Sequence, residues 1–266
     1  MDDAQIKEMV RARYGGIAEA AGDAGCCGPV TSCCGDTAAG NPVEKSREMG
    51  YSDAELAAVP DGANLGLGCG NPQAIAALQP GEVVLDLGSG AGFDCFLAAQ
   101  QVGKAGHVIG VDMTHEMLKK ARENAAKIEA TNVEFRLGEL EHLPVADNTI
   151  DVVMSNCVIN LVPDKGQVFR ETFRVLKPGG RVAVSDVVNT APLSDELQSD
   201  TTLLCGCIAG AAPVERIETW LKEAGFTEVR VTPKPESREL ISTWAPGRGI
   251  EDYVVSATVE ARKPAR

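Results

Sequence analysis

Residues 82–95 read EVVLDLGSGAGFDC. The first part is a short run of aliphatic and β-branched residues, which predicts a buried strand, and the alternate glycines that follow it predict a tight turn. From Phe93 the pattern changes to that of a helix. A strand, a glycine turn and a helix in this order are typical of the first unit of a doubly wound sheet, in which the turn lies beside the bound ligand.

The alternation of short strands and amphipathic helices continues along the chain. Two late strand candidates, at 228–232 and 253–262, can pair antiparallel across a long loop and so complete an otherwise parallel sheet. The sequence therefore predicts an α/β protein with a doubly wound, seven-stranded, mostly parallel sheet of the Rossmann-like kind. The other strands are expected at 82–88, 107–112, 133–137, 150–155 and 181–186.

Compositional breaks divide the chain into four segments. A short opening helix and a capping box at Ser52–Glu55 flank a Gly/Ala/Cys/Pro stretch that carries no apolar period. We expect an N-terminal arm with a cysteine-rich loop at 1–59, a ligand-binding core at 60–186, an inserted substrate cap at 187–213, and a final helix with antiparallel strands at 214–266.

Charge and hydropathy exclude several classes of protein. The chain has 266 residues, with 38 acidic against 25 basic residues and a net charge of −13. Such a surface repels phosphate backbones, so no nucleic-acid partner is expected. No stretch approaches the roughly 18 consecutive apolar residues of a membrane span, and the charged opening lacks an export signal. We therefore expect no membrane partner, a cytoplasmic location and nine free thiols.

The charges around the glycine turn indicate a cationic ligand. The turn reads GxGxG, and the third glycine of a dinucleotide motif would fall at Phe93, which weakens an NAD interpretation. Asp86 lies two residues before Gly88 and would repel a pyrophosphate, whereas it would attract a cation. S-adenosylmethionine carries an ammonium and a sulfonium and no phosphate, so we favour it over NAD.

The ends of the next strands supply further candidates for this donor site. Asp112 lies 22 residues beyond Gly90, a separation at which an acid reaches a ribose diol. The segment after the third strand would pass beside the adenine. The candidate donor-binding residues are Asp86, Gly88, Gly90, Asp112, Met113, Glu139, Leu140 and Asn156.

The core also resembles a known family. VLDLGSGAG, the acid of GVDM and RVLKPGGRVAVSD are similar, in order, to signature segments of the class I methyltransferases over about residues 80–262. The resemblance implies an S-adenosylmethionine-dependent methyltransferase with a reversed final strand, and it leaves the methyl acceptor open.

Three cysteines are candidates for holding the acceptor. Cys157 directly follows the fourth strand, Cys69 lies in a glycine loop before the core, and Cys207 lies in the apolar cap. The glycines beside Cys69 and Cys207 permit close approach to a ligand. Three thiolates select a thiophilic centre such as trivalent arsenic or zinc, and only arsenic retains a lone pair that can accept a methyl group. Alternatively each cysteine is a small buried hydrophobe, the default interpretation for Cys95.

A closer resemblance concerns these cysteines. GLGCGNP, SNCVINLVPDK and GCIAGA are similar to segments of the arsenite methyltransferase family over about residues 60–262. The resemblance implies arsenic ligation by Cys69, Cys157 and Cys207, with arsenite or its thiol conjugates as substrate. It also implies a role in arsenic detoxification and a cellular thiol reductant, such as glutathione or thioredoxin.

The arm carries a CC-x5-CC cluster, formed by Cys26, Cys27, Cys33 and Cys34. An N-terminal cysteine assists substrate handling in the family, which implies delivery of arsenic through Cys27. A zinc site and an unstructured thiol-rich tail are the competing interpretations.

Two other functions remain open at this point. A methyltransferase of a small organic acceptor, such as a quinone carbon, would use the same core without needing Cys157. A metalloid or zinc binder without catalytic activity would retain the fold as a sensor.

Overall fold

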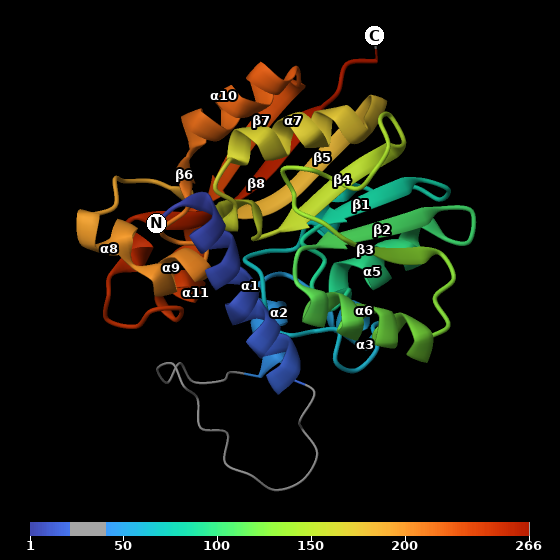
Figure 1. Cartoon of the computed structure of the whole chain (residues 1–266), viewed down its shortest axis with the longest axis horizontal. Helices are drawn as coiled ribbons and strands as arrows, with labels where there is room; N and C mark the ends of the chain where they lie inside the picture. The colour runs from blue at the N-terminus through green and yellow to red at the C-terminus, as the bar shows by residue number, and fades with distance from the viewer. Residues whose placement is uncertain (22–40, 266) are drawn as a thin grey trace, which may run out of the picture.

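The computed structural model describes residues 1–21 and 41–265 (Figure 1). The cysteine cluster of the arm, including the proposed delivery residue Cys27, lies outside these described residues, so its assignment stays a prediction. Within the two described ranges, no helix has both the length and the apolar character needed to cross a membrane.

One mixed sheet forms the centre of the molecule. Five strands run parallel in the order β3-β2-β1-β4-β5, and β8 then lies antiparallel between β5 and β7. This reversal confirms the predicted antiparallel pair, and the short β6 pairs with the end of β5. The strands are β1 Val83–Leu87, β2 His107–Asp112, β3 Val133–Leu137, β4 Ile150–Asn156, β5 Leu176–Asn189, β6 Ala212–Pro213, β7 Thr227–Lys234 and β8 Val254–Arg262.

Helices cover both faces of the sheet (Figure 1). In β1, Val84 packs into the apolar cluster under α5 and α6, whereas Leu85 and Leu87 belong to the cluster under α7 and α10. Successive side chains of a strand point to opposite faces, and both faces are covered, which explains the continuous apolar run in the sequence. The covering helices are α5 Phe93–Val102, α6 His115–Lys127, α7 Lys165–Val175 and α10 Val214–Ala224.

The N-terminal arm contains more helix than the sequence indicated. We expected a short opening helix, but α1 spans Asp3–Ala20 and continues through two glycines. Its buried face, which includes Val10 and Ala18, packs on the rest of the protein, and this packing outweighs the low helix propensity of glycine. The helix α2 Pro42–Glu48 was not predicted, whereas the capping box at Ser52 begins α3 Asp53–Ala57 as expected.

Two segments, far apart in the sequence, share one apolar cluster beside the carboxyl ends of the strands. The segment expected as a cap, 187–213, contributes α8 Asp195–Ser199 and α9 Thr201–Cys205, but its first residues continue β5 to Asn189 and its last two form β6. The connection between β7 and β8, which we expected to be a plain loop, contributes α11 Arg238–Ser242 and an ion pair between Arg248 and Asp200 at 2.6 Å. The remaining short helices are α4 Gln73–Ala76, η1 Ile159–Leu161, η2 Pro235–Ser237 and η3 Ile250–Asp252.

Candidate active site

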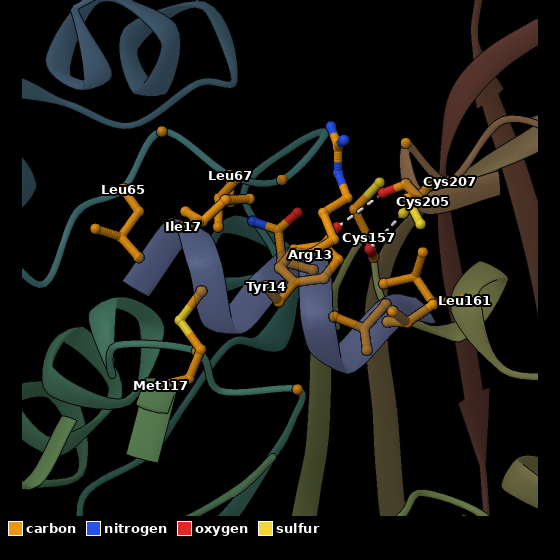
Figure 2. A pocket seen from close by; sticks show the side chains of 18 of the residues that line it. Arg13, Tyr14, Ile17, Leu65, Leu67, Met117, Cys157, Leu161, Cys205 and Cys207 are labelled. Carbon is orange, nitrogen blue, oxygen red and sulfur yellow. Dashed lines mark hydrogen bonds between the residues drawn. The ribbon is translucent and has the colours of Figure 1, made fainter. Parts of the chain in front are cut away.

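A cavity of about 1350 Å³ opens at the carboxyl ends of the parallel strands. It lies where the strand order reverses between β1 and β4, the position at which doubly wound sheets bind their ligands. Figure 2 shows α1 running across this cavity, with Arg13, Tyr14 and Ile17 on the helix and cysteines gathered at one end. The cavity therefore has a floor of strand ends and a roof that includes α1.

The glycine turn forms one side of the floor. Gly88 has a φ of 72°, and a Cβ at this position would lie 2.5 Å from the side chain of Val158. Only glycine combines that backbone with that space. The amides of Gly88 and Ser89 both donate to the carbonyl oxygen of Val111, at 2.7 and 3.1 Å, which ties the turn to β2.

Asp112 connects the glycine turn to the end of β2. Its carboxylate accepts hydrogen bonds from the amides of Gly90, at 2.9 Å, and Thr114, at 2.8 Å. Burial raises the pKa of Asp112, and the two amides act against that rise. The side chain is thus fixed in place where it lines the cavity.

Two more buried carboxylates line the same part of the cavity. Asp86 accepts the thiol of Cys95 at 3.2 Å, and Asp94 accepts the hydroxyl of Tyr51 at 2.7 Å. Burial and the neighbouring charge of Asp94 raise the pKa of Asp86 well above its ordinary value, and burial raises the pKa of Asp94 to about 6. Neither carboxylate forms an ion pair within the described part of the chain. The site therefore suits a cationic ligand.

Of the predicted donor residues, Glu139 is placed differently from the expectation. Its carboxylate pairs with Lys7, at 2.7 Å, and with Arg11, both on α1, and it does not line the cavity. Leu140 and Glu141 line it instead. The two cations of α1 explain the difference, because they draw the side chain of Glu139 outward and lower its pKa.

The structure brings the three candidate cysteines together from separate segments. The sulfurs of Cys69 and Cys157 and a carboxylate oxygen of Asp186 all lie within 4.8 Å of one another. The thiol of Cys207 donates to the carbonyl oxygen of Cys157 at 2.8 Å (Figure 2). All three cysteines are buried; Cys157 and Cys207 line the cavity, whereas Cys69 does not.

Backbone conformation holds two of these thiols in place. Cys157 has a φ of 58° and Cys207 a φ of 64°, in the left-handed region that residues other than glycine avoid. Hydrogen bonds with the thiols of Cys207 and Cys69, together with burial, raise the pKa of Cys157 well above its ordinary value. The thiol of Cys157 acts to lower the pKa of Cys207, but burial and the charge of Asp186 outweigh it, so that pKa is raised too.

The loop that carries Cys69 is fixed by neighbouring side chains. Its amide donates to Asn156 Oδ1 at 3.0 Å, and its carbonyl oxygen accepts the hydroxyl of Ser256 at 2.9 Å. A Cβ on Gly68 would lie 2.7 Å from Asn156 Nδ2, and one on Gly70 would collide with Ser185. The flanking glycines therefore permit close approach of protein side chains, where we had expected close approach of a ligand.

Comparison with known proteins identifies the family. A model of the methyltransferase domain matches residues 78–225. The chain is 58% identical, over 272 aligned residues, to an arsenite methyltransferase of Halobacterium salinarum, covering 100% of this chain and 68% of that protein. The chain belongs to the arsenite methyltransferase family. The 58% identity covers the whole chain, and so extends beyond residues 78–225 that the methyltransferase model matches.

Two other proteins of the comparison are less similar to this chain. An arsenite methyltransferase of Aquipseudomonas alcaligenes is 46% identical over 171 residues, which is 62% of this chain and 49% of that protein. The chain thus matches about half the length of that relative. The crystal structure of an arsenic (III) S-adenosylmethionine methyltransferase from Chlamydomonas reinhardtii superposes with a TM-score of 0.60 at 32% identity, covering 84% of this chain and 73% of that one.

Asp186 and Tyr14 were not singled out from the sequence as residues of the site. Asp186 accepts the amide of Ile159 at 3.0 Å and the side-chain amide of Asn160 at 2.9 Å, so it anchors the turn after Cys157, and burial raises its pKa to about 6. Asp186 ends the strand that we expected at 181–186, as Asp112 ends the one expected at 107–112, so the sequence did contain a signal, although β5 continues to Asn189. Tyr14 donates to the carbonyl oxygen of Cys205 at 3.2 Å and carried no such signal.

Proposed function

We propose that this chain transfers methyl groups from S-adenosylmethionine to trivalent arsenic held by Cys69, Cys157 and Cys207. The observation that carries the proposal is the convergence of these thiols from three separate segments. Two of them, Cys157 and Cys207, line a cavity that also holds carboxylates without an ion-pair partner among the described residues. The similarity to arsenite methyltransferases over the full chain supports it independently.

The donor half of the cavity fits S-adenosylmethionine. This cosubstrate supplies, when bound, an electrophilic methyl group on a sulfonium centre. Asp86 and Asp94 have no cationic partner among the described residues, so a bound ammonium or sulfonium would favour their ionised forms and be attracted by them. Asp112 has lone pairs left for a ribose diol beyond the two amides that it already accepts.

The thiol half fits arsenite as substrate. Each cysteine thiol displaces one hydroxyl from arsenous acid. Three S–H and three As–O bonds break, three As–S bonds form, and each hydroxyl leaves as water with a thiol proton. Arsenic then keeps one lone pair, directed away from the sulfurs. Catalysis consists of holding this lone pair in line with the methyl group, so no general base is needed.

Electron balance supports the need for a reductant. Attack by the arsenic lone pair raises arsenic formally from the trivalent to the pentavalent state, and another round of methylation needs two electrons. A cellular thiol reductant, such as glutathione or thioredoxin, would supply them. The five described cysteines are all free, which fits a reducing compartment such as the cytoplasm.

Mass analysis of arsenic products tests the proposal. Wild type and the C69S, C157S and C207S variants would be incubated with arsenite, S-adenosylmethionine and a thiol reductant. We expect methylated arsenic from wild type and none above background from the variants. The matched control is C205S, because Cys205 is equally buried but Cys207 is the residue that contacts Cys157. Full arsenite methylation by C157S would contradict the proposal.

A further inference from the structure

A continuous chain of hydrogen bonds joins the two halves of the cavity. Asn156 Nδ2 donates to the hydroxyl oxygen of Tyr51 at 3.0 Å, and that hydroxyl donates to Asp94 Oδ1 at 2.7 Å. At the other end, Asn156 Oδ1 accepts the amide of Cys69 at 3.0 Å, and Asn156 Nδ2 also donates to the carbonyl oxygen of Gly70 at 2.8 Å. The chain thus begins at a carboxylate of the donor half and ends at the backbone of an arsenic ligand.

The direction of these bonds is fixed by chemistry. The Tyr51 hydroxyl has one proton and gives it to Asp94, so its oxygen is free to accept from Asn156. One proton of the Asn156 amide is used on Gly70, and the other points to Tyr51 at 3.0 Å, with a longer contact of 3.5 Å to Asp94 Oδ2. The shorter path from Asp94 to Asn156 therefore runs through the Tyr51 hydroxyl. Each bond in such a chain polarises the next, and an ionised carboxylate at the end strengthens all of them.

Tyr51 is built into this position. It is 3% exposed, and its ring packs edge-on against Phe93 with 4.8 Å between ring centroids. Phe93 itself lines the cavity and begins α5. Side chains this closely packed transmit a change at the carboxylate to the amide, because they have little room to adjust independently.

A cation in the donor half would act on the first member of the chain. The charge of Asp94 raises the pKa of its buried neighbour Asp86, and burial raises the pKa of Asp94 itself to about 6. A bound cation lowers both pKa values, so Asp94 becomes fully ionised and accepts more strongly from Tyr51.

We propose that Tyr51 is a positioning residue that couples donor binding to the placement of Cys69, so that a cationic donor increases affinity for arsenite. The proposal rests on the function proposed above. By thermodynamic reciprocity, arsenite must increase affinity for the donor by the same factor.

Arsenite titrations test the coupling without turnover. The dissociation constant for arsenite would be measured by calorimetry on the full chain, alone, with saturating sinefungin, which carries an amine in place of the sulfonium, and with saturating S-adenosylhomocysteine, which is uncharged at sulfur. In wild type we expect sinefungin to tighten arsenite binding by about fivefold or more, the low end of typical coupling between sites. S-adenosylhomocysteine should tighten it less.

Two variants and a control then locate the coupling. Y51F removes only the hydroxyl, and we expect the effect of sinefungin to fall below twofold while arsenite still binds. In D94N, measured with each analogue at saturation, sinefungin and S-adenosylhomocysteine should tighten arsenite binding equally. Y253F is the matched control, because Tyr253 does not line the cavity, and it should retain the wild-type coupling. Thermal unfolding would verify that each variant is folded.

The possible failures are distinguishable. Wild-type coupling that survives in Y51F, or equal effects of the two analogues, would overturn the role of Tyr51 and leave the proposed function intact. If wild type binds no arsenite under any condition, the proposed function fails and this inference fails with it.

Discussion

The donor half of the cavity and its thiol half are built in opposite ways. The donor half uses neighbouring strand ends of one sheet, with Asp86 as the penultimate residue of β1 and Asp112 as the last residue of β2. The thiol half gathers Cys69, Cys157 and Cys207 from a loop, a strand end and a cap, and two of them adopt left-handed backbone. A motif specifies the first half, whereas the complete fold specifies the second.

Removing a thiol should give the largest difference between the effect on arsenite methylation and the effect on donor binding. C157S retains the shape of the side chain but replaces sulfur, which arsenic prefers, with oxygen. We expect arsenite methylation to fall by about a hundredfold or more, since one ligand in three is lost. Sinefungin affinity, measured by calorimetry, should change by less than about twofold. This affinity is measured without arsenite, where the proposed coupling does not act, so a comparable loss of analogue binding would mean that Cys157 contributes to the donor site itself.

Removing a charge from the donor half should give the converse result. In D112N the side chain keeps its shape and loses its negative charge. Hydrogen bonds to charged groups contribute about 1.5–3 kcal/mol, so the donor KM should rise by about 10- to 100-fold. Arsenite binding in the absence of donor should be unaffected. Weakened arsenite binding in that assay would contradict a separate donor half.

Acid should weaken the donor half. The pKa of Asp94 is about 6 in the free protein, and burial also raises that of Asp86. Only the ionised carboxylate attracts a cation, so affinity is present above this pKa and is lost as pH falls through it. At one unit below, we expect sinefungin to bind about tenfold more weakly than at neutral pH. An affinity that stays constant over this range would show that neither carboxylate contacts the ligand.

The smallest effect is expected at the edge of the cavity. Glu139 was assigned to the donor site from sequence, whereas the structure pairs it with Lys7 and Arg11. These groups are partly exposed, and such ion pairs contribute about 1 kcal/mol or less. E139Q should therefore raise the donor KM by only about two- to threefold. An increase as large as that of D112N would restore the original assignment.

The sequence predicted those parts of the molecule that depend on neighbouring residues. The strand–turn–helix unit, the acid that ends β2 and the reversed final strands all follow from local patterns, and so does Cys157 directly after β4. Tyr51 and Asn156 are 105 residues apart, and no periodicity reveals their contact. Likewise, the connection between β7 and β8 has no regular apolar period, yet it forms part of the cap.

The convergence of three thiols also bears on resistance to unfolding. One arsenic atom bonded to all three sulfurs would staple together a loop before the core, the end of β4 and the cap, and the span from Cys157 to Cys207 alone encloses 50 residues. Because the three sulfurs converge only in the folded state, the free energy of arsenite binding adds to the free energy of unfolding. Arsenite is then a folding ligand of its own enzyme, and the melting temperature should climb with arsenite concentration even where no methyl donor is present.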